Sequence, residues 1–93
     1  MNVIKQRTID AAIRTLDESD RRKVFAWFQH LENWEHDEQV RMLSKLTTDK
    51  DVYVLNTSDD IRIFFKLDLP KQVISIIDIA KPSRFEKVRT VTE

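Results

Sequence analysis

Apolar residues recur at helical spacing near the start of the chain. A short segment at 2–5 fits a β-strand, and beyond it Ile9, Ile13 and Leu16 fall on one face of a helix expected over 7–16. The remaining positions of that helix are mainly polar, so one face is suited to a protein core and the other to water. We therefore predict a strand followed by an amphipathic helix.

A second helix is expected after a polar step at 17–20. Its carboxylates and hydroxyl can accept hydrogen bonds from the free N–H groups that open a helix. The helix should reach about residue 33, with Phe25 on its flank and an apolar face formed by Val24, Trp27, Phe28, Leu31 and Trp34. The two helices are expected to form a hairpin, and both tryptophans are assigned to the core or to a partner contact.

The segment 35–46 is compatible with two structures. Val40, Leu43 and Leu46 continue the helical spacing, which favours a further helix. An extended connection that ends at Leu46 also fits the residues. We take the helix as the prediction for this segment.

The second half of the chain changes to a period of two, which is typical of strands. Strands are expected at 52–57, 61–67 and 73–80, joined by polar turns into two antiparallel hairpins. In the middle strand, one face should meet the helices, and it is formed by Ile61, Ile63, Phe65 and Leu67. The other face should be open, and it is formed by Arg62, Phe64 and Lys66. By the same alternation, Tyr53 and Leu55 should face the helices.

Helices that precede a meander of strands predict an α+β fold, in which a helix hairpin packs on a mostly antiparallel sheet in the order βααβββ. The 93 residues should make one domain, since a chain of this length supports a single core. Residues 85–93 are expected to be a short helix or a flexible tail.

Composition excludes several kinds of chemistry. The chain has no cysteine, so no disulfide framework or thiolate nucleophile is available, and a reducing cytoplasm is the expected compartment. It has no glycine, which argues against phosphate-cradling loops and nucleotide cofactors. His30 and His36 would diverge on a continuous helix, so no metal site is expected. The paired carboxylates at 17/20, 37/38 and 59/60 fit helix caps and turns better than an acid/base dyad.

Charge and hydropathy limit the kinds of partner that this chain is expected to bind. The 16 basic and 16 acidic residues cancel, which does not favour binding to polyanions by the molecule as a whole. A local excess of basic residues near the C-terminus includes Lys81, Arg84, Lys87 and Arg89, and forms either a basic tip or a solvated tail. The apolar run 73–77 is too short to cross a bilayer, so neither membrane insertion nor secretion is expected.

Five segments occur in a characteristic order: the step into the second helix at 16–24, the pair Lys45-Leu46, the strand at 52–55, the turn and arginine-bearing strand at 58–66, and the apolar strand that ends at Lys81. Over nearly the whole chain, this order resembles the RelE/ParE toxin superfamily. The resemblance implies a type II toxin that an antitoxin peptide holds inactive by wrapping its helices and sheet. Many members cut mRNA in the ribosome, and others poison DNA gyrase.

In the RNA-cutting branch, a 2′-hydroxyl attacks the adjacent phosphate, and basic side chains on the open sheet face stabilise the growing negative charge. The resemblance assigns Arg62 to this role, with Lys81 or Arg84 in place of a second arginine. Without the resemblance, Arg62 would be an ordinary strand arginine in a surface ion pair.

RNA contacts are expected at Lys45 and Lys66 on the sheet, and at Phe85 through base stacking, although packing is the favoured role of Phe85. The other active-site residues of the RNA-cutting members are missing. Val54 and Asn56 stand where those enzymes carry lysines, and no tyrosine or histidine follows near the C-terminus. Two hypotheses stay open: a toxin that cleaves ribosome-bound mRNA, and a non-enzymatic gyrase poison or inactive antitoxin-binding relative.

Overall fold

The computed structural model describes residues 1–48 and 51–81. These residues form three helices and five strands, and in chain order the elements are β1 (Asn2–Lys5), α1 (Arg7–Arg14), α2 (Glu18–Glu32), α3 (Glu38–Leu43), β2 (Ser44–Leu46), β3 (Val52–Asn56), β4 (Arg62–Asp68) and β5 (Val73–Ala80). The structure is therefore a compact α+β domain, as the sequence predicts.

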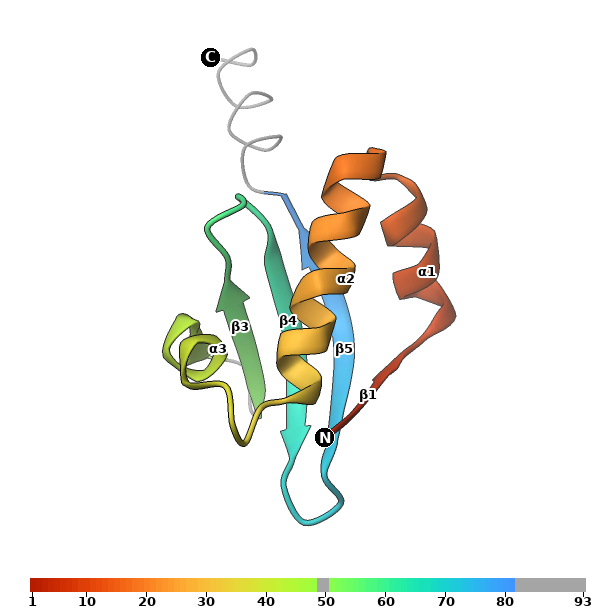
Figure 1. Cartoon of the computed structure of the whole chain (residues 1–93). Helices are drawn as coiled ribbons and strands as arrows, with labels where there is room; N and C mark the ends of the chain where they lie inside the picture. Colours follow the sequence, from red (N-terminus) through yellow and green to blue (C-terminus); the bar gives the residue numbers. More distant parts are fainter. Residues whose placement is uncertain (49–50, 82–93) are drawn as a thin grey trace.

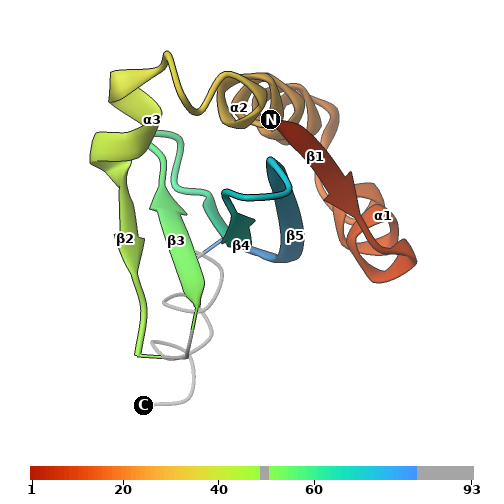
Figure 2. The ribbon, with the colours of Figure 1, turned by 90° about the horizontal axis from the view of Figure 1, so that it is seen from below.

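The five strands form one mixed sheet in the order β1-β5-β4-β3-β2. Strands β2 to β5 pair antiparallel with their neighbours, whereas β1 runs parallel to β5 at the edge. Helices α1 and α2 lie on one face of the sheet (Figures 1 and 2). No described helix covers the opposite face, which we call the open face.

Carboxylates begin two of the helices, as expected from the paired acids. Asp17 accepts a hydrogen bond from the Asp20 N–H at 2.8 Å, which caps the start of α2. Asp37 does the same for α3 by accepting from the Val40 N–H at 3.0 Å. The prediction that these acids serve as caps is confirmed at both positions.

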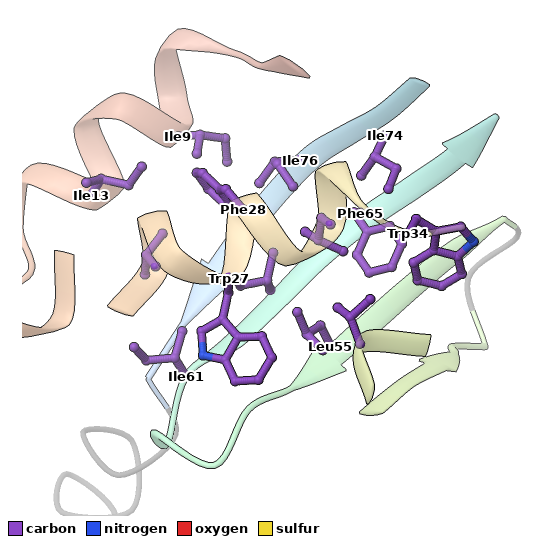
Figure 3. Close-up of a cluster of buried hydrophobic side chains, with 14 of the residues drawn as sticks. Ile9, Ile13, Trp27, Phe28, Trp34, Leu55, Ile61, Phe65, Ile74 and Ile76 are labelled. Carbon is purple, nitrogen blue, oxygen red and sulfur yellow. The ribbon is translucent and has the colours of Figure 1, made fainter. Parts of the chain in front are cut away.

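The core lies between α1, α2 and the sheet (Figure 3). Phe65 is fully buried at its centre, stacked on Tyr53 with ring centroids 5.6 Å apart and edge-on to Trp34 at 5.8 Å. Ile61, Ile63 and Phe65 face the helices as the alternation predicts, and Trp27 and Trp34 are buried as well.

The prediction of a helix throughout 35–46 is wrong at both ends, because residues 35–37 precede α3 and residues 44–46 follow it. Helix α3 stops at Leu43, and residues 44–46 form β2, which pairs with β3. The Ser44 hydroxyl donates to the Val40 carbonyl at 2.7 Å, and the Ser44 backbone turns extended, so the helix cannot continue. The observed order is thus βαααββββ: α3 is the helix expected within 35–46 but shorter, and β2 is a strand that the sequence did not predict.

Candidate functional site

On the open face, strand pairing arranges the side chains in cross-strand rows. Arg62 lies between Asn56 on β3 and Ala80 on β5. Directly opposed residues of antiparallel strands share a face, so Arg62 projects away from the helices. The prediction that this arginine lies on the open face is therefore confirmed.

The turn between β3 and β4 positions Arg62. The Thr57 side chain bonds both ends of this turn: its hydroxyl donates to the Ile61 carbonyl at 2.8 Å and accepts from the Asp59 and Ile61 N–H groups at 3.2 and 3.3 Å. Asp60 adopts a left-handed backbone with φ 59°, a conformation that aspartate tolerates better than most residues in a chain without glycine.

A second anchor ties this turn to the helix layer. The Trp27 indole N–H donates to the Asp59 carboxylate at 3.0 Å, and the Lys23 ammonium lies 4.0 Å from the same group. Helix α2 thus holds the turn from the core side. Trp27 combines a core position with a polar contact that the sequence pattern does not reveal.

A hollow of about 400 Å³ opens at this turn, lined by Asn56, Thr57, Asp60, Ile61 and Arg62. Arg62 is exposed, and no side chain among residues 1–48 and 51–81 forms an ion pair or hydrogen bond with its guanidinium. Its planar fork of N–H donors can therefore bind a phosphate in a bidentate manner. The Asp60 carboxylate also lines the hollow, and its negative charge weakens anion binding there.

The two expected RNA-binding lysines lie on the same face but in other rows. Lys66 sits four residues beyond Arg62 on β4 and is paired with Val52 and Ser75. It helps to line a second hollow of about 540 Å³ near the β4–β5 turn. Lys45 lies on the edge strand β2, opposite Val54. The three cations therefore share a face without converging on one point.

Lys81 is placed elsewhere. Its ammonium lies 2.5 Å from the carboxylate of Asp20 near the start of α2, where the Asp20 side chain is only 6% exposed and the Lys81 side chain 24%. Since Ala80 shares the open face with Arg62, Lys81 turns to the helix side. The structure does not bring Lys81 and Arg62 together. Arg84 and Phe85, the other expected site residues, lie outside the described residues.

No family model matches the chain, and no curated protein or solved structure matches it either. Only the small α+β fold with its five-stranded mixed sheet is established. Within the described residues, no helix is long and apolar enough to span a membrane, and no cluster of three metal-ligating side chains occurs.

Sequence reasoning missed a β-bulge that changes which side chains face outward. Phe64 pairs with Asp78, but the next residue, Phe65, pairs with Ile76, so Ile77 is the extra residue on β5. The bulge places Asp78 on the open face beside Phe64. An acid within the run Ile76-Ile77-Asp78-Ile79 gives no bulge signal in the sequence, because the isoleucines fit either register.

A second polar contact joins α2 to the start of α3. His30 Nδ1 lies 2.5 Å from Asp37 Oδ2, while the other Asp37 oxygen caps α3. The hydrogen bond from His30, followed by that from the Val40 N–H, holds the pKa of Asp37 below its usual value. Asp37 thus links the helices in its ionised form.

A lowered pKa makes this contribution to stability depend on pH. Stabilisation by ionised Asp37 is fully present above the unfolded pKa, about 4, and is lost as the pH falls through the lower folded pKa. Asp37→Asn is expected to lower the thermal midpoint at pH 7. Below about pH 4, the thermal midpoint of this variant should decrease less steeply with falling pH than that of the wild type. Circular dichroism melts from neutral to acidic pH measure both effects. The exposed Glu35→Gln is the matched control, and an Asp37→Asn profile parallel to wild type would contradict the assignment.

Proposed function

We propose that this protein is the toxin of a RelE/ParE-like toxin–antitoxin pair and that its open sheet face contacts RNA. The observation that carries the proposal is Arg62, an exposed arginine on that face beside a hollow and without a described partner. Apart from the additional α3 and β2, the element order agrees with what the sequence resemblance implies, and so does the location of this arginine. Membership of the family is part of the proposal.

In the cleaving version of this function, the substrate's own 2′-hydroxyl attacks the neighbouring phosphorus. The 2′-oxygen loses its proton as it bonds to phosphorus, and a pentacoordinate phosphorane forms. The bond from phosphorus to the 5′-oxygen then breaks, the 5′-oxygen takes up a proton, and a 2′,3′-cyclic phosphate remains. Arg62 would bind the non-bridging oxygens and stabilise their growing charge. Cleavage would take place on mRNA in the ribosome, which could supply groups that this chain lacks.

A second version, binding without cleavage, is favoured by the position of Lys81. Its ion pair with Asp20 directs the ammonium away from Arg62, and Val54 and Asn56 contribute no charge to the open face. Such a protein would be a gyrase poison or an inactive relative that still binds an antitoxin. Controlled expression in bacteria separates these outcomes: a block in translation with cut mRNA supports the nuclease, a block in replication supports the gyrase poison, and normal growth supports the inactive relative.

The antitoxin is proposed to bind at the β2 edge of the sheet. The apolar face of α2 is used in the core, so it offers little surface to a partner. By contrast, Met42 in α3 is 73% exposed, and Leu46 on β2, the last strand of the sheet, is 63% exposed. An edge strand with exposed apolar neighbours can accept a further strand from a partner peptide.

Charge placed at this edge is expected to weaken the complex. Met42→Glu combined with Leu46→Glu should reduce recovery of the antitoxin by at least about tenfold, because two exposed apolar contacts are replaced by charges that binding would desolvate. Co-purification of the toxin and the product of the adjacent gene, with quantification of both chains, measures this effect. Leu69→Glu is the matched control, since Leu69 is an exposed leucine in the β4–β5 turn. Equal recovery of the antitoxin with both variants would contradict antitoxin binding at the β2 edge.

A further inference from the structure

The open face of β4 alternates cation, aromatic ring and cation. Arg62, Phe64 and Lys66 are successive outward residues, so Phe64 stands between two positive side chains that are about 13 Å apart along the strand. Phe64 is only partly buried and does not belong to the core cluster. Its ring is therefore a partly buried apolar surface with a cation on either side.

The bulge in β5 adds a hydrogen-bond acceptor next to this ring. Asp78 is directly opposite Phe64, and one of its oxygens accepts from the Ile79 N–H at 2.8 Å. No other group in residues 1–48 and 51–81 bonds to the Asp78 carboxylate. If the side chains of β5 alternated regularly from Ile76 through Ile77, with no bulge, this acid would lie on the helix side of the sheet.

We propose that Phe64 stacks on a base of single-stranded RNA while Asp78 accepts a hydrogen bond from the edge of that base. Arg62 and Lys66 bind the phosphates on either side. Aromatic rings on an open sheet bind unstacked bases in this manner, and a carboxylate accepts from exocyclic amines such as that of cytosine. The proposal rests on the RNA contact of the proposed function and adds the residues that hold and select one base.

Charge complementarity favours RNA as the occupant of this surface. Strand pairing puts Lys45, Arg62 and Lys66 on the described open face, against the carboxylates of Asp68 and Asp78. One oxygen of Asp68 accepts from the Lys71 N–H at 3.2 Å in the β4–β5 turn, at the far end of β4 from Arg62. Asp60 lines the hollow beside Arg62, and Asp51 and Asp68 line the hollow beside Lys66, so these acids lie toward the two ends of β4. The sheet neighbours of Phe64 itself are two cations, Arg62 and Lys66, and one carboxylate, that of Asp78.

The test measures binding of labelled single-stranded oligocytidine and oligouridine, each about ten nucleotides long, to the full chain by fluorescence anisotropy at low salt. Phe64→Leu is expected to weaken binding to both by about 5- to 150-fold, the range for losing one stacked base, while Phe64→Tyr keeps most of the affinity. Phe25→Leu, which alters an exposed ring of α2, should leave binding unchanged. Asp78→Asn should reduce the preference for cytidine over uridine by about fivefold.

The outcomes separate this inference from the proposed function. Wild-type binding that Arg62→Ala weakens and Phe64→Leu does not would overturn base stacking and leave the RNA contact intact. Absence of RNA binding by the wild type would overturn both base stacking by Phe64 and the RNA contact of the proposed function. If Phe64→Leu instead weakens only the recovery of the antitoxin, the face is a protein interface and the inference is wrong. Thermal melts of each variant show whether an affinity change reflects unfolding.

Discussion

If the protein is the proposed nuclease, Arg62→Ala is expected to lower cleavage of ribosome-bound mRNA by about a hundredfold in single-turnover experiments, while the thermal midpoint changes little. The loss corresponds to removal of one preorganised charge that stabilises the transition state. Stability should be retained because Arg62 is exposed and has no partner within residues 1–48 and 51–81. Primer extension on purified ribosomes after rapid mixing measures the rate, and calorimetry measures the midpoint.

Two further variants make this result specific. Arg62→Lys keeps the charge but loses the planar fork of donors, so it should recover only part of the rate. Arg22→Ala removes another arginine, one that pairs with Glu18 on the exposed surface of α2, and should cleave like wild type. Equal rates for wild type and Arg62→Ala would return Arg62 to an ordinary surface residue. A wild type that cuts no RNA would leave the binding-only version of the function.

The strands could be predicted from sequence because a period of two leaves few alternatives. The pattern in β4 identified which side chains are buried, and the observed bounds of β1 and β5 equal the expected ones. The segment 35–46 was harder, because Val40 and Leu43 fit a helix and the short β2 contributes only three residues. Its pairing with β3 is a tertiary contact, and local spacing carries no information about it.

The candidate site could be predicted only in part, for a similar reason. Arg62 was found because alternation within a single strand determines its face. The position of Lys81 depends on Asp20, a residue 61 positions earlier in the chain, and charged residues in a sequence do not reveal their distant partners. Asp78 depends on a bulge of one residue. Long-range pairing and strand register, rather than residue type, decide what these groups can do.

The ion pair between Lys81 and Asp20 leads to the largest expected effect on stability. Lys81→Ala would leave the Asp20 carboxylate, 6% exposed, without its cation at the junction of α2 and β5. Removal of one partner from a buried ion pair costs about 3 kcal/mol or more, and partial exposure of Lys81 favours the lower end of that range. For a domain of this size, the thermal midpoint should fall by more than about 10 °C.

The two single variants of this ion pair should differ in stability, because only the Lys81 ammonium can reach water when its partner is removed. In Asp20→Asn, the Lys81 ammonium, 24% exposed, can turn to solvent on its flexible stem, so the loss of stability should be smaller than in Lys81→Ala. The double variant removes the orphaned carboxylate as well and should be more stable than Lys81→Ala alone. Urea unfolding of the four proteins measures these differences. If Lys81→Ala unfolds like wild type yet loses RNA cleavage, Lys81 acts on the substrate, and the ion pair contributes little to the fold.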